Sequence, residues 1–141
     1  MRWAASAILL SLGWGACAVS VSGPQPQRIE PGQAVSLRIG ESAEVAGGRL
    51  RFGFESVGAD SRCPKGAQCV WAGNAAVRIW VQREGGPLER RELHTTTGGA
   101  REPPDPGVRL LALEPVPVVG RTLEQRDYVA TLAPAASAPE R

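Results

Sequence analysis

The sequence predicts an all-β protein, a small antiparallel β-sandwich or barrel-like domain of about seven strands with one short-loop disulfide. Three observations support this fold class. Apolar and polar residues alternate over several short stretches, and no window of eleven or more residues has a helical period. Turns rich in glycine and proline separate these stretches. Short strands spaced in this way are typical of sandwiches and small barrels.

The first 33 residues are expected to lie outside the β-domain. Residues 1–18 have the features of an export signal, since Arg2 supplies a positive start and residues 4–12 form an apolar stretch. That stretch is too short for a membrane span, which needs about twenty residues. Residues 19–33 contain three prolines and are expected to form an extended, proline-rich tether.

The end of the export signal has two interpretations. Cleavage after Ala18 would follow a small-x-small pattern, whereas cleavage before Cys17 would follow a lipobox-like end and leave a diacylglycerol on the Cys17 sulfur. Small residues precede Cys17, although Trp14 fits the lipobox poorly. Lipidation of Cys17 would leave an even pair of the three cysteines for an oxidising compartment. We therefore expect an exported, lipid-anchored envelope protein facing the periplasm or the exterior.

Residues 34–134 are expected to hold the β-domain, and residues 135–141 a disordered tail. The alternating stretches predict strands at 34–39, 42–46, 49–57, 75–83, 88–95, 108–113 and 127–133. The Gly47-Gly48 pair is a hairpin signal between the second and third of these strands. The predicted inward residues are Val35, Leu37, Ile39, Leu50, Phe52, Phe54, Val77, Ile79, Val81, Tyr128, Ala130 and Leu132.

Other stretches predict how the strands are placed. The mixed charges of 88–95 indicate a sheet edge, and the apolar 108–113 stretch indicates a strand covered on both faces. Glycines and prolines at 98–107 predict a surface loop. Trp80 lies on the outward side of its strand, so either a second sheet or the proline-rich segments cover it, or it is an exposed binding aromatic.

The segment from Asp60 to Asn74 is the most distinctive part of the chain. Cys63 and Cys69 are six residues apart, and the proline and glycine between them allow the chain to turn back and bring the two cysteines together. Closing so short a loop stabilises the fold by about 2.4 kcal/mol in the chain-entropy model. The candidate binding residues of the loop are Asp60, Arg62, Lys65, Trp71 and Asn74.

Further expectations concern the base and the packing of this loop. Asp60 and Ser61 are expected to pin its base through side-chain hydrogen bonds. Trp71 follows Cys69 by two residues, so its ring is expected to pack on or near the disulfide. The spacing is wrong for a thioredoxin-like redox site, and too few ligands are present for a zinc site.

A family resemblance rests on the residues Asp60, Ser61, Arg62, Cys63, Pro64, Cys69, Trp71 and Gly73. They match a DSRCP-x(4)-C-x-W-x-G signature, and the segment resembles a family of small, secreted or lipid-anchored bacterial proteins of unknown function. The match covers about 15 to 20 of the 141 residues. The resemblance implies an exported all-β domain, and it implies no substrate, cofactor or reaction.

Charge and motifs narrow the function classes. The formal net charge is +2, and the arginines are dispersed among glutamates, which is typical of a solvated surface and not of a nucleic-acid site. No nucleophile elbow or phosphate-binding loop occurs. His94 is the only histidine and is expected to be idle on an edge strand. We therefore expect no enzyme activity, no metal and no cofactor.

The expected function is a non-catalytic structural or interaction module of the cell envelope. Its partner would be an envelope protein or a peptide, and it would contact the membrane through the lipid anchor only. One alternative is an inhibitor-like or peptide-binding protein that uses the loop from Cys63 to Cys69 and displays Lys65. A further alternative is an enzyme or metal carrier whose site assembles in a cleft from scattered residues such as Asp60, Arg62 and His94.

Lipidation of Cys17 can be tested directly. Mature protein is expected to partition into detergent and to carry a diacylglyceryl mass, and Cys17→Ser is expected to release a soluble form or to stall processing. Intact mass and detergent partitioning of envelope protein are the measurements. Native protein that begins at Val19 would instead establish cleavage after Ala18.

Overall fold

The computed structural model describes residues 23–95 and 107–135. The predicted export signal with Cys17, most of the predicted 98–107 loop and residues 136–141 lie outside the described residues. Within them the chain forms eight strands and one short 3-10 helix, η1 (Gln125–Asp127). The predicted all-β class is confirmed, with eight strands where about seven were expected.

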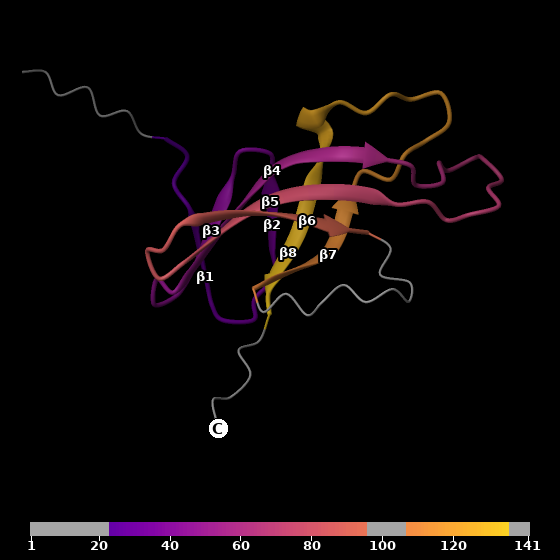
Figure 1. The fold of residues 1–141 in the computed structure, drawn as a ribbon. Coiled ribbons are helices and arrows are strands. Elements are labelled where there is room, and N and C mark those ends of the chain that lie inside the picture. The colour runs from indigo at the N-terminus through magenta and orange to yellow at the C-terminus, as the bar shows by residue number, and fades with distance from the viewer. Residues whose placement is uncertain (1–22, 96–106, 136–141) are drawn as a thin grey trace, which may run out of the picture.

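The strands form two sheets that face each other (Figure 1). The larger sheet has the order β1 (Gln27–Ile29), β3 (Ser42–Val45), β4 (Leu50–Asp60), β5 (Ala75–Arg83) and β6 (Leu88–His94). The smaller sheet has the order β2 (Val35–Arg38), β8 (Val129–Pro134) and β7 (Val108–Glu114). Figure 1 shows the long strands of the larger sheet crossing those of the smaller sheet steeply, so the architecture is a sandwich with crossed sheets.

Strand pairing is antiparallel throughout except between β1 and β3, which pair in parallel. The predicted hairpin joins β3 and β4, and Gly47 and Gly48 have φ values of 94° and 70° there. The connection covers the four residues 46–49, where the glycine pair alone had suggested a two-residue turn, and its two positive φ values are left-handed backbone that glycine adopts without steric cost. The glycine pair therefore fixes this hairpin.

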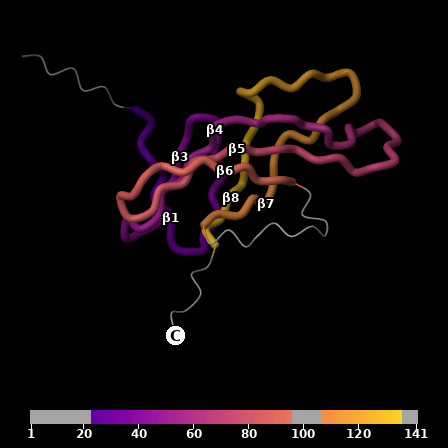
Figure 2. Tube along the Cα trace, viewed as in Figure 1, coloured from indigo at the N-terminus to yellow at the C-terminus, as the bar shows by residue number. Residues whose placement is uncertain are grey.

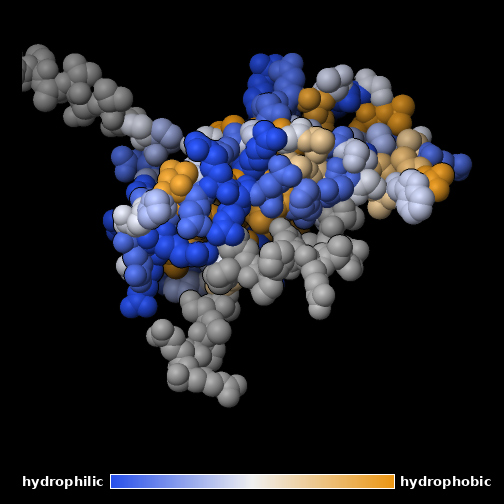
Figure 3. All heavy atoms as spheres, in the orientation of Figure 1, coloured by the Kyte–Doolittle hydropathy of each residue, from blue (hydrophilic) through white to orange (hydrophobic). Residues whose placement is uncertain are grey.

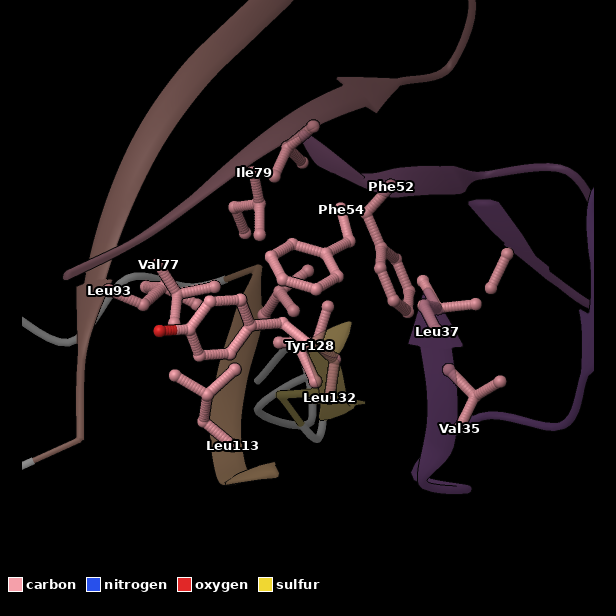
Figure 4. Close-up of a cluster of buried hydrophobic side chains, with 14 of the residues drawn as sticks. Val35, Leu37, Phe52, Phe54, Val77, Ile79, Leu93, Leu113, Tyr128 and Leu132 are labelled. Carbon is pink, nitrogen blue, oxygen red and sulfur yellow. The ribbon is translucent and has the colours of Figure 1, made fainter. Parts of the chain in front are cut away.

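The core lies between the two sheets. Figure 4 shows Phe52, Phe54 and Ile79 of the larger sheet packed against Leu37 and Leu132 of the smaller one. In the β4–β5 pair, Phe52 lies opposite Val81 and Phe54 opposite Ile79, so alternate residues of both strands point inward. The other predicted inward residues are also buried, except Ile39 and Leu50, which are partly buried against the core.

Two predictions of strand placement were wrong. The predicted tether contains β1, whose Ile29 is buried and accepts a backbone hydrogen bond from the Ala46 N–H at 2.8 Å. The alternation of a three-residue strand is too short to detect among prolines.

β7 was expected to be covered on both faces, yet Leu111 is 52% exposed, because β7 lies at the edge of the smaller sheet and its outer face is open.

Trp80 is covered in a way that none of the sequence interpretations anticipated. It lies directly opposite Gly53 on the neighbouring strand, and its ring occupies the space that a Cβ atom at position 53 would fill. The glycine thus provides room for the ring on the outer face of the larger sheet. Cross-strand packing of an aromatic ring over a glycine compensates for the glycine's missing side chain.

All described strands and the buried core lie within residues 27–134. A chain that starts at residue 19 therefore keeps every element of this fold. The predicted edge position of the charged strand is confirmed, because β6 is the last strand of the larger sheet.

Phe52→Ala is expected to lower the free energy of unfolding by about 3–5 kcal/mol, because it removes a fully buried ring from the centre of the core. Leu88→Ala is the matched control, since Leu88 is 49% exposed on β6 and should change stability by less than about 0.5 kcal/mol. Urea unfolding of the chain from residue 19 measures both. Equal losses in the two variants would contradict this description of the core.

Candidate functional site

The loop after β4 is fixed to the opposite sheet by one buried arginine. The Arg62 guanidinium donates to both carboxylate oxygens of Asp60, from Nε at 2.8 Å and from Nη2 at 2.7 Å. It also donates to the backbone carbonyls of Leu113 at 2.6 Å and Pro115 at 2.9 Å, at the end of β7. The Asp60 and Arg62 side chains are only 9% and 12% exposed. Arg62 therefore joins the end of β4 to the end of β7.

A third side chain completes this cluster. The Tyr128 hydroxyl donates to Asp60 Oδ2 at 3.0 Å, and Figure 4 shows its ring among Val77 and Leu113. Burial would raise the pKa of Asp60, but the hydrogen bonds from Arg62 and Tyr128 and the guanidinium charge outweigh burial and lower the pKa below its ordinary value. Burial, and then the bond to Asp60, raise the pKa of Tyr128. Asp60 is thus held as a carboxylate with all its charge compensated locally.

The base of the loop is closed by Ser61 and Asn74. The Ser61 hydroxyl donates to the Asn74 carbonyl at 2.9 Å and accepts from the Asn74 N–H at 3.1 Å. Gly73 has a φ of 71°, and a Cβ atom there would overlap the Ser61 carbonyl. Only glycine fits such a close approach of two backbone segments. The expected side-chain bond to a backbone N–H two positions on is confirmed for Asp60, which accepts from the Arg62 N–H at 3.2 Å, whereas Ser61 closes the loop base by bonding the returning segment at Asn74.

The closed part of the loop is held from two sides. Cys63 and Cys69 form the predicted disulfide, with their Cα atoms 5.9 Å apart. Lys65 donates its N–H to the Pro117 carbonyl at 2.8 Å, and its own carbonyl accepts from the Val119 N–H at 3.1 Å. The loop therefore pairs with the segment that follows β7. We call residues 61–74 and 115–123 together the tip.

The tip exposes large apolar side chains. Val70 and Trp71 are 89% and 82% exposed, so the expectation that the Trp71 ring packs on the disulfide was wrong. The disulfide is itself near the surface and offers the ring no buried partner. The paired segment adds the exposed side chains Val116, Val118 and Val119. Figure 3 shows hydrophobic atoms at this end of the molecule, which the two loops form in Figure 2.

His94 does not join the Asp60–Arg62 pair. Its Nδ1 lies 2.7 Å from the side-chain amide of Asn74, and its Nε2 lies 3.7 Å from Glu92. Asn74 Oδ1 in turn accepts the Thr95 N–H at 3.1 Å. Among the predicted site residues, the structure thus brings Asp60 and Arg62 together, and separately pairs Asn74 with His94.

Sequence reasoning missed the second half of the tip. Pro115 and Pro117 were interpreted only as the end of a strand, and Tyr128 only as a core residue. The signal in the sequence was an apolar Pro-Val-Pro-Val-Val run outside any alternating stretch. Apolar residues that cannot enter a sheet ladder, because prolines interrupt it, must either cover another segment or remain exposed.

Comparisons with protein-family models, with curated proteins and with solved structures find no match to this chain. Within residues 23–95 and 107–135, no helix is long and apolar enough to cross a membrane. Over the same ranges, no set of three or more His, Cys, Asp and Glu side chains lies together as a group that could hold a metal ion.

Asp60→Asn is expected to lower the free energy of unfolding by about 2–4 kcal/mol at neutral pH, because it leaves the buried guanidinium without its carboxylate. The lowered pKa of Asp60 stabilises the fold fully above the ordinary value of 3.8, and this contribution is lost as the pH falls through the folded-state value. The difference in the free energy of unfolding between wild type and variant should therefore become smaller below about pH 4. Urea unfolding at a series of pH values measures it.

The control for this prediction is Glu114→Gln, which neutralises an exposed carboxylate on β7. It is expected to leave stability at neutral pH unchanged within about 0.5 kcal/mol. If the stability difference between wild type and Asp60→Asn stays constant down to strongly acidic pH, the Asp60 charge does not stabilise the fold.

Proposed function

We propose that this chain is an exported cell-envelope protein, lipid-anchored through Cys17, whose β-domain is a non-catalytic interaction module that contacts its partner through the tip. The export signal and lipobox-like end of residues 1–18 support the location. The resemblance of the segment from Asp60 to Gly73 to small secreted or lipid-anchored proteins supports it independently.

The observation that supports an interaction role is the exposure of Trp71. Seven of the eight signature residues are used inside the domain, in the Asp60–Arg62 cluster, the disulfide, the loop turn and the closed loop base. The eighth, Trp71, is 82% exposed. A large aromatic side chain held on a fixed loop and left in water is typical of a contact surface, because such residues dominate binding energy at interfaces.

The inhibitor-like alternative is less well supported by the geometry. Protease inhibitors present a basic residue on a backbone that is free to pair with the enzyme. Here the Lys65 N–H and carbonyl are both hydrogen-bonded to the segment after β7. A partner that engaged this backbone would first have to break those two bonds, which favours binding by the side chains of the tip.

Photo-crosslinking in intact cells tests the proposal. A photoreactive residue at position 70 is expected to give a discrete adduct, and Trp71→Ala should reduce its yield by about tenfold or more, as loss of an aromatic hot spot does. The same photoreactive residue at position 111, also exposed but on β7, is the matched control. Equal adducts from both positions, or an adduct that survives Trp71→Ala, would refute a contact through the tip.

A further inference from the structure

The apolar side chains of the tip protrude from the domain. Val70 and Trp71 are almost fully exposed, so they contact little of their own domain, and three further valines are exposed on the paired segment. A protein partner would need a pocket shaped to receive these side chains. The boundary between lipid headgroups and acyl chains accepts any protruding apolar shape, and tryptophan is enriched there.

The charge of the tip also favours a lipid surface. The tip contains no aspartate or glutamate; apart from Arg62, whose charge Asp60 compensates, its two cations are Lys65 and Arg121. Both cations are exposed, and within the described residues neither forms an ion pair. On the outer face of the larger sheet, by contrast, arginines pair with glutamates, as Arg78 does with Glu92. The tip therefore carries two cations without an ion-pair partner beside apolar side chains, with Glu114 and Glu124 only at its borders, and it complements an anionic surface.

We propose that the tip docks on an anionic lipid surface, with Trp71 and the exposed valines at the boundary between headgroups and acyl chains and with Lys65 and Arg121 among the lipid phosphates. This inference rests on the proposed function, because it names the partner of the contact surface proposed there. It departs from the expectation that the lipid anchor is the only membrane contact, because the tip would be a second one.

The tip is preorganised for such a contact. The disulfide, the two backbone bonds of Lys65 and the bonds from Arg62 to the Leu113 and Pro115 carbonyls all fix the loops in place. Docking therefore orders few additional side chains, and less of the interaction energy is lost to entropy.

The anchor and the tip can reach the same membrane. Figure 2 shows the start of the described chain at the end of the domain opposite the tip. The roughly ten residues from Cys17 to Gln27 span at most about 35 Å, and the eleven residues of β4 extend over a similar length. A tether of that reach is long enough for a domain attached at Cys17 to bring its tip to the same membrane.

Vesicle binding by the chain from residue 19, which lacks the anchor, tests this inference. Co-sedimentation with vesicles of equal parts phosphatidylglycerol and phosphatidylcholine is expected, with a shift of tryptophan fluorescence to shorter wavelength that is absent in Trp71→Ala, which keeps Trp80. Binding should weaken steeply when ionic strength rises from about 0.05 M to about 0.5 M. Vesicles of phosphatidylcholine alone should bind much less. No binding to the anionic vesicles at low salt would overturn the inference.

Paired variants locate the contact. Replacing both Lys65 and Arg121 with glutamine should lower the affinity by at least about 25-fold, that is about fivefold for each cation. Replacing Val70 with serine and Trp71 with alanine should lower it by about tenfold or more. The matched control replaces Arg109 with glutamate and Leu111 with serine on β7 and should bind as wild type does. Circular dichroism verifies that each variant is folded.

The outcomes separate this inference from the proposed function. Loss of binding in the control as large as in the tip variants would overturn the docking of the tip. If the chain does not bind vesicles but the adduct at position 70 still depends on Trp71, the partner is a protein. That result overturns the lipid inference and leaves the contact through the tip standing.

Discussion

The buried ion pair of Asp60 and Arg62 is the interaction on which the tip depends. A guanidinium that is 12% exposed is tolerable only if a carboxylate and enough acceptors surround it, and Asp60 and two backbone carbonyls supply them. The carbonyls belong to the end of β7, in the other sheet. The same bonds that compensate the charge therefore tie the two sheets together at the end of the sandwich where the loops emerge.

The residues of the short sequence signature, Trp71 excepted, act together to close the loop. Asp60 and Arg62 are two residues apart in an extended chain, so their side chains lie on the same side and meet. Ser61 lies between them and faces the returning strand, where Gly73 leaves room for its carbonyl. Each of these residues is needed for the loop to close, whereas Trp71 contributes nothing comparable to the closure.

The sequence predicted the fold well where a long alternation meets a buried face. Phe52 and Phe54 occupy inward positions that a period of two identifies without any knowledge of the partner sheet. It predicted poorly where the outcome depends on a distant segment. The place of β1, the exposed face of β7 and the pairing of Lys65 with the segment after β7 are decided by contacts that no local pattern encodes. For the same reason, the loop residues could be chosen from the sequence but not the valines beside them.

Gly53 and Trp80 have a consequence for how this chain can change over evolutionary time. The Trp80 ring lies where any side chain at position 53 would have to be, so substitutions at the two positions depend on each other. A residue larger than glycine fits at position 53 only after Trp80 has been replaced by a small residue. A small residue at position 80, in turn, leaves Gly53 without the ring that covers it. In a set of descendants, these two positions should therefore vary together, even though neither lies in the core or at the tip.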